Sequence, residues 1–179
     1  MGWAFSEIHG WHERGRNIEV PIGHDERNIF YTLIYRRDGT ATVFITLSQT
    51  RSQVQAMYDD AIFIVSGITE TSTRPADIGL NPRSMIGVKP NGNIILMAVD
   101  SGISGNNPQL SSVENERNLR SAISVREGVR ILTAMGAVHT LNLDGGSSTQ
   151  MWYDGQIWTQ PWLNSRFADV GSVLVIYDR

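Results

Sequence analysis

A carboxylate, two glycines and three hydroxyl side chains stand in a row in LNLDGGSSTQM, residues 141–151. Asp144 is the only carboxylate of this motif, and a carboxylate can act as a nucleophile or as a general base. Gly145 and Gly146 allow a sharp turn, and their N–H groups could point at an anion. The hydroxyl groups suit phosphate or sugar oxygens, and they belong to Ser147, Ser148 and Thr149.

Several kinds of loop or turn could contain this motif. A flexible linker is excluded, because the motif lies between an expected buried strand and an expected tight hairpin. The lysine of a phosphate-binding P-loop is absent, and so is the G-x-S-x-G pattern of many hydrolases. The motif alone leaves two interpretations open: an active-site turn, or a structural turn in which Asp144 caps its own backbone.

Two other stretches add groups that could take part in the same chemistry. Arg83 opens an expected strand in LNPRSMIG, and Asp100 closes the partner strand in MAVDSG. An arginine fork is a natural clamp for a phosphate diester, although Arg83 could equally form an ordinary surface ion pair. Asp100 could be catalytic or could cap a loop. Asn142 would share a strand face with Asp144, where it could orient that carboxylate or a sugar hydroxyl.

The segments that must position these groups are mostly strands joined as hairpins. Turn signals at Asp38-Gly39, Asn91-Gly92 and Asp154-Gly155 each lie between two strand-like runs. Further buried strands are expected at residues 61–67, 137–144 and 170–178. Because consecutive hairpins dominate, the sequence predicts one α+β domain over residues 1–179, with a mixed, mainly antiparallel sheet and about two packed helices.

The two helices are predicted from capping signals and apolar spacing. The first is expected within residues 50–61, with Thr50 and Gln53 as a capping box. Its apolar stripe would consist of Val54, Met57 and Ala61. The second is expected to begin at Ser124, paired with Glu127 in a capping box, and to end before Gly136.

The composition restricts the class of function. The chain has 179 residues, a net charge of −3 and no run of basic residues, so nucleic-acid binding is not expected. No apolar stretch reaches the length of a membrane span. The absence of cysteine excludes thiolate catalysis and zinc–thiolate sites. His9 and His12 have no obvious acidic third ligand, so the question of a metal is left open, and no cofactor is expected.

Three blocks of the sequence resemble the phosphodiester glycosidase family, the group of the uncovering enzyme that removes N-acetylglucosamine from mannose-6-phosphate diesters. The blocks are NPRSMIGVKPNGNIILMAVDSG, MGAVHTLNLDGGSSTQM and RFADVGSVLVIY. The resemblance covers residues 50–179 and is best over 81–179, whereas residues 1–49 form an N-terminal hairpin region without recognised correspondence. Ser147 replaces a third family glycine, Ser101 replaces the glycine of V-D-G, and only Ser66-Gly67 corresponds to an N-G-G-F-F stretch.

The resemblance implies a hydrolase that cleaves the glycosidic bond of a sugar-1-phosphodiester and releases a sugar and a phosphomonoester. The phosphate leaving group needs a stabilising cation more than a strong general acid. The implied catalytic residues are Asp144, Asp100 and Arg83. The implied substrate-binding residues are Asn142, Gly145, Gly146, Ser147, Ser148, Thr149 and Arg166.

A second class of function stays open, namely a non-catalytic module that binds a phosphosugar polymer within a larger assembly such as a phage tail. Trp152, Trp158 and Trp162 could stack on sugar rings or pack within the protein. Residues 1–17 lack the features of a signal peptide, so the chain either is not exported by that route or is an excerpt of a longer protein. The lack of signal-peptide features and of cysteine favours a bacterial or phage protein over a lysosomal one, with a cell-wall phosphosugar polymer as substrate. A homo-oligomer also stays open.

Overall fold

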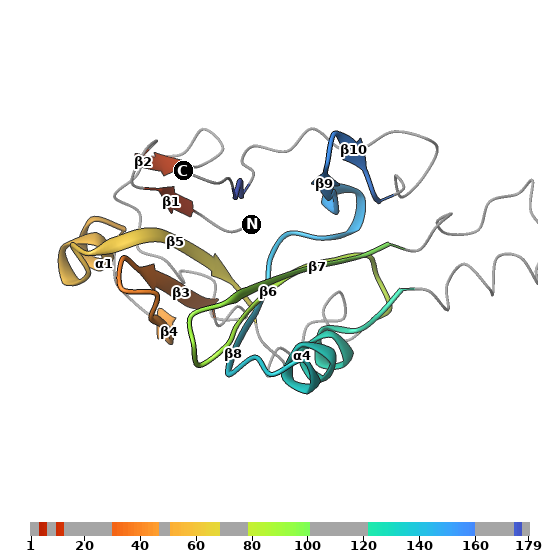
Figure 1. Cartoon of the computed structure of the whole chain (residues 1–179), viewed down its shortest axis with the longest axis horizontal. Helices are drawn as coiled ribbons and strands as arrows, with labels where there is room; N and C mark the ends of the chain where they lie inside the picture. The colour runs from red at the N-terminus through yellow and green to blue at the C-terminus, as the bar shows by residue number, and fades with distance from the viewer. Residues whose placement is uncertain are drawn as a thin grey trace, which may run out of the picture.

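The structure is a computed structural model that describes residues 4–6, 10–12, 30–46, 51–68, 79–100, 122–159 and 174–176. Within these ranges the chain forms two antiparallel sheets, a small separate hairpin and two α-helices (Figure 1). This arrangement confirms the predicted α+β fold, and every strand pair described is antiparallel.

The larger sheet has five strands in the order β2-β1-β5-β3-β4. These strands are β1 Ala4–Ser6, β2 Gly10–His12, β3 Phe30–Arg36, β4 Ala41–Thr46 and β5 Ala61–Gly67. The predicted hairpin around Asp38-Gly39 is confirmed as β3 and β4, and the predicted strand over residues 61–67 is confirmed as β5. Helix α1, Arg51–Met57, connects β4 to β5.

The smaller sheet has three strands in the order β7-β6-β8, which are β6 Arg83–Val88, β7 Ile94–Val99 and β8 His139–Asn142. The hairpin predicted around Asn91-Gly92 is confirmed as β6 and β7. In the register of this sheet, Arg83 pairs with Val99, and Met85 pairs with Asn142. The start of β6 and the ends of β7 and β8 therefore meet at one edge.

The central strand β6 is buried on both faces, because the chain covers each face with a different element. On one face Ile86 packs in a cluster with Leu33 of the five-stranded sheet. On the other face Met85 packs with Leu132 of helix α4, Val125–Ala134. The three-stranded sheet thus lies between the five-stranded sheet and α4, which holds its strand ends in place (Figure 1).

The two sheets are joined at the edge where the ends of β7 and β8 lie. Ile68, directly after β5, exchanges backbone hydrogen bonds of 3.0 and 2.8 Å with Asn142. Gly67 lies so close to the carbonyl of Asn142 that no side chain would fit there. The end of β5 therefore fixes the end of β8, from which the DGGSST motif begins.

Helix α4 begins with the predicted capping box. The hydroxyl of Ser124 accepts the Glu127 N–H at 3.2 Å, and the Glu127 carboxylate accepts the Ser124 N–H at 2.8 Å. The helix ends at Ala134, and Gly136 follows with a φ of 94°, as its predicted C′ position requires. The bonds from Ser124 lower the pKa of the Glu127 carboxyl below its ordinary value near 4.5.

Ser124→Ala should destabilise the protein by about 0.5–2 kcal/mol, because the first turn of α4 loses its cap. A carboxyl whose pKa is lower in the folded state contributes stability that is present above its unfolded pKa and is lost as pH falls through the folded pKa. The difference in unfolding free energy between wild type and Ser124→Ala should therefore shrink below pH 4.5. Urea titrations at pH 7 and pH 3.5 would measure it, and an unchanged difference would contradict this assignment.

Two predicted elements differ from the structure. Helix α1 ends at Met57, whose side chain is exposed, and Ala61 is already in β5, so the predicted stripe through Met57 and Ala61 is wrong. Thr50 of the predicted first capping box lies outside the described residues. Of the strand predicted at residues 170–178, only 174–176 are described, and they are exposed and not part of a strand.

Candidate active site

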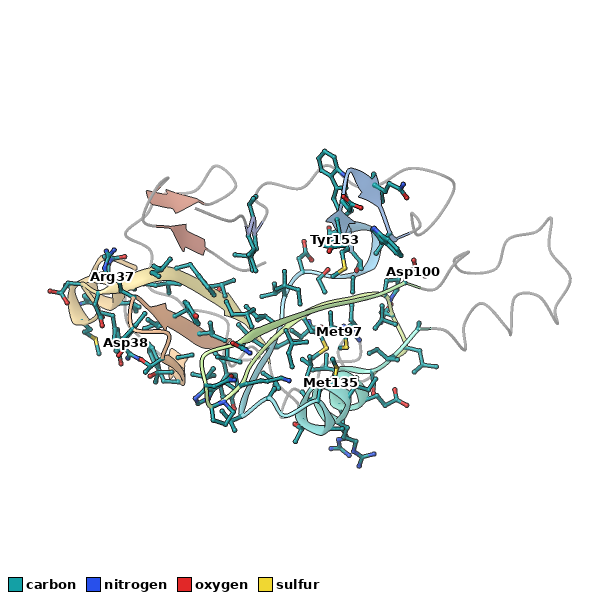
Figure 2. All side chains as sticks on the ribbon, viewed as in Figure 1. Arg37, Asp38, Met97, Asp100, Met135 and Tyr153 are labelled. Atoms are coloured by element: carbon teal, nitrogen blue, oxygen red, sulfur yellow. The ribbon has the colours of Figure 1, made fainter. Side chains whose placement is uncertain are left out.

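Groups from separate sequence motifs lie at one end of the three-stranded sheet, where β6 begins and β7 and β8 end. Arg83 is the first residue of β6, Asp100 directly follows β7, and Asp144 lies two residues beyond the end of β8. Figure 2 shows Asp100 at this end of β7. Because β7 and β8 flank β6 on opposite sides, their backbones lie about 10 Å apart, twice the spacing of neighbouring strands. The candidate site therefore lies across the start of β6.

The loop that carries Asp144 is fixed to the start of β6 by backbone hydrogen bonds. The Leu143 N–H donates to the Ser84 carbonyl at 2.8 Å, and the Gly146 N–H donates to the Pro82 carbonyl at 2.9 Å. The loop then makes a single 3₁₀ turn over Gly146–Ser148. Asp144 is exposed, and its carboxylate accepts the Gly145 N–H at 3.0 Å. The motif thus presents its carboxylate to solvent from an anchored turn.

The two glycines of the loop serve different purposes. Gly146 has a φ of 64°, in the left-handed region that favours glycine, and so makes the sharp turn for which the glycines were predicted. Gly145 has an extended backbone, with a φ of −140°. A Cβ atom on Gly145 would lie 2.7 Å from the Pro82 carbonyl oxygen, so this position requires glycine because the loop approaches β6 closely.

Gly145→Val should displace the loop and remove activity, because the new side chain would collide with the Pro82 carbonyl. Overpacking of this kind destabilises proteins by about 1–3 kcal/mol. Gly155→Ala is the control, since its Cβ would meet nothing within 4 Å, and only the strain of its φ of 74° should be felt. Thermal unfolding and activity would be measured for both variants. A valine variant as stable and active as wild type would contradict the close approach.

Asn142 and Asp144 lie in different environments. The side chain of Asn142 is 3% exposed, and its Nδ2 donates to the Leu143 carbonyl at 2.7 Å. The predicted shared strand face is wrong, because β8 ends at Asn142 and Asp144 lies outside the strand. Asn142 therefore supports the backbone beside Asp144, because its amide donates to the carbonyl of the intervening residue.

Two buried oxygens at this edge lack a hydrogen-bond partner within the described part of the chain. They are Oδ1 of Asn142 and Oγ1 of Thr149, and the Thr149 residue is 2% exposed. An unsatisfied buried polar group destabilises a protein by about 1–3 kcal/mol, so such groups in native structures call for a functional or solvent explanation.

Arg83 is buried, with 4% of its residue surface exposed. Its Nε donates to the Ile123 carbonyl at 3.1 Å, and its Nη2 donates to the Gly79 carbonyl at 2.8 Å. The alternative of an ordinary surface ion pair is therefore wrong. Arg83 joins two segments, around Gly79 and Ile123, to the start of β6. Contact between Arg83 and a phosphate stays a prediction.

Comparison with known protein families identifies the family of the chain. The sequence profile of the phosphodiester glycosidases matches residues 13–177. The chain belongs to the phosphodiester glycosidase family. The match begins upstream of residue 50 and so includes β3 and β4, which the short motifs had left without correspondence. A search of curated proteins found no match.

Four backbone N–H groups of this loop are already engaged. Besides the bonds of Gly145 and Gly146, the Ser148 N–H donates to the Gly145 carbonyl at 3.2 Å, and the Thr149 N–H donates to the Gly146 carbonyl at 3.1 Å. The expectation that the glycine N–H groups are free to point at an anion is wrong for this conformation. The glycines of the motif shape the turn, so polar contacts to a ligand would come from the side chains of the motif.

Some predicted site residues cannot be placed, and others were missed. Arg166, Trp162 and the side chain of Ser147 lie outside the described part of the structure. Gly67 and Ile123 were not predicted as site residues, although Gly67 packs on Asn142 and the Ile123 carbonyl accepts from Arg83. The Ser66-Gly67 pair was the only sequence signal for Gly67, and no sequence signal marked Ile123.

The described ranges of the chain contain no group of three or more His, Asp or Glu side chains placed to hold a metal ion. They also contain no helix whose length and apolar character would let it span a bilayer.

Proposed function

We propose that this protein hydrolyses the glycosidic bond of a sugar-1-phosphodiester. Water adds to the anomeric carbon, the bond from that carbon to the phosphate oxygen breaks, and a free sugar and a phosphomonoester leave. The family match supports the reaction class. The observation that carries the proposal is the exposed carboxylate of Asp144 on a turn that is anchored to the start of β6.

Asp144 is assigned the role of nucleophile or of general base for the attacking water. Its exposure leaves the carboxylate accessible to substrate, and the Gly145 N–H orients one of its oxygens. Asp100 is the second carboxylate of the proposal, on the opposite side of β6. A substrate lying across the start of β6 would contact both carboxylates from the same edge of the sheet.

The sugar and the phosphate are assigned to different groups. The sugar would lie against the exposed Asp144, while the buried side chains of Asn142 and Thr149 support the loop that carries it. The hydroxyls of Ser147 and Ser148 and the guanidinium of Arg166 would hold the phosphate and stabilise its developing charge. Gly145 and Gly146 shape the turn, and Arg83 stabilises the segments around it.

The proposed natural substrate is a phosphosugar polymer of a bacterial cell wall, and the proposed setting is a bacterial or phage protein, including a phage tail assembly. The hairpin that follows the loop, residues 152–157, exposes aromatic side chains. This supports a polymeric substrate, because aromatic rings stack on sugars. Under the alternative function, a non-catalytic module, the same surface binds the polymer and leaves it intact.

A screen against sugar-1-phosphodiesters tests the proposal. The purified protein would be incubated with N-acetylglucosaminyl methyl phosphodiester and with aryl glycosides, and the products would be identified by mass. Release of the free sugar together with methyl phosphate is the expected result. Retention of a phosphosugar polymer without any product would instead support the binding module.

A further inference from the structure

The hairpin that follows the active-site loop exposes a group of aromatic rings. Strands β9, Trp152–Tyr153, and β10, Gln156–Ile157, pair directly around the predicted Asp154-Gly155 turn, which is thereby confirmed. Tyr153 is 70% exposed and Trp158 is 65% exposed. Figure 2 shows Tyr153 on this hairpin. Only two residues lie between Thr149 and Trp152, so their Cα atoms lie within about 11 Å.

The aromatic rings are divided between the two faces of the hairpin. Trp152 pairs with Ile157 and Tyr153 with Gln156, and side chains of neighbouring residues in a strand point to opposite faces. The rings of Tyr153 and Trp158 contact each other, with centroids 6.5 Å apart and planes inclined by 57°. Tyr153 and Trp158 therefore form one aromatic face, and Trp152 belongs to the other.

The Tyr153–Trp158 face is held in a fixed arrangement although it is exposed. The indole N–H of Trp158 donates to the Tyr153 carbonyl at 3.0 Å, and its backbone N–H donates to the Met151 carbonyl at 2.8 Å. The Met151 N–H in turn donates to the buried hydroxyl of Thr159 at 3.0 Å. Rings that are already oriented lose little conformational freedom when a ligand binds.

We propose that the Tyr153–Trp158 face is a stacking subsite for a pyranose ring of the polymer whose phosphodiester is cut at Asp144. The inference rests on the proposed function. A pyranose ring has an apolar face and a polar rim, which matches two aromatic rings beside the side chain of Gln156. A stable protein interface buries about 800 Å² on each partner, far more than these two side chains offer, so a sugar ring fits the size of the face better.

The test compares Trp158→Ala with Trp152→Ala, a matched control on the opposite face of the same hairpin. Each variant would be assayed with poly(N-acetylglucosamine 1-phosphate) and with N-acetylglucosaminyl methyl phosphodiester, which carries a single sugar ring and leaves no second ring for the subsite. Trp158→Ala should raise the ratio of the polymer KM to the short-substrate KM by about three- to tenfold. Trp152→Ala should change this ratio by less than about twofold.

An unchanged ratio in Trp158→Ala, or an equal change in both variants, would overturn the subsite. So would a change of oligomeric state in Trp158→Ala by analytical ultracentrifugation, because the face would then contact a second copy of the chain. Failure of the wild type to hydrolyse either substrate would refute the proposed function instead. The subsite would then be tested alone by affinity electrophoresis in the polymer, where wild type should be retarded and Trp158→Ala should not.

Discussion

Asp144→Asn is expected to keep the fold and to lower kcat by about 10²–10⁴-fold or more, the range attributed to a positioned acid or base. The amide has nearly the same shape as the carboxylate, and its oxygen can still accept the Gly145 N–H that orients the side chain. It is neither basic nor nucleophilic, so the chemical step should fail while the anchored turn persists. Steady-state kinetics on the methyl phosphodiester and a thermal unfolding curve would measure the two effects.

Asp59→Asn is the matched control, because Asp59 is also exposed and lies in the turn after α1, within the five-stranded part of the fold. It should retain the wild-type kcat. An Asp144→Asn protein that folds and turns over at the wild-type rate would remove Asp144 from the mechanism. The same substitution in Asp100 would then be the next to examine.

Arg83→Lys is expected to destabilise the protein and to reduce activity alike on phosphodiester and aryl glycoside substrates. A lysine ammonium keeps the charge but lacks the planar fork that reaches the carbonyls of both Gly79 and Ile123. Leaving one of these carbonyls unsatisfied would destabilise the protein by about 1–3 kcal/mol. For a domain of this size that corresponds to a fall in Tm of roughly 2–12 °C, which differential scanning calorimetry would detect.

The comparison of substrates separates a supporting role from direct phosphate binding. An aryl glycoside leaving group has no phosphate, so a clamp on phosphate would lose kcat/KM with the diester alone. Arg130→Lys, on the exposed surface of α4, should leave stability and both activities unchanged. A loss confined to the phosphodiester, with an unchanged Tm, would show that Arg83 contacts the substrate, as the family resemblance implies.

Local signals in the sequence predicted much of the fold. The Asp-Gly and Asn-Gly turns and the capping box of Ser124 and Glu127 were all confirmed, because each depends on contacts within a few residues. The end of α1 was not predicted. Apolar spacing extended that helix through Met57 to Ala61, but Ala61 pairs with Arg36 in the five-stranded sheet, a partner distant in sequence.

The sequence by itself determined which residues form the candidate site and to which family the chain belongs. The motif LNLDGGSSTQM, its order relative to Arg83 and Asp100, and the family match over residues 13–177 all depend on residue identity and spacing. Only the tertiary structure decided the environment of each group. Arg83 is buried against two carbonyls, Asn142 is enclosed while Asp144 is exposed, and the Tyr153–Trp158 face is turned to solvent. The physical reason is that burial and hydrogen-bond partners are set by segments far apart in the chain, such as β5 against the end of β8, whose approach no local pattern encodes.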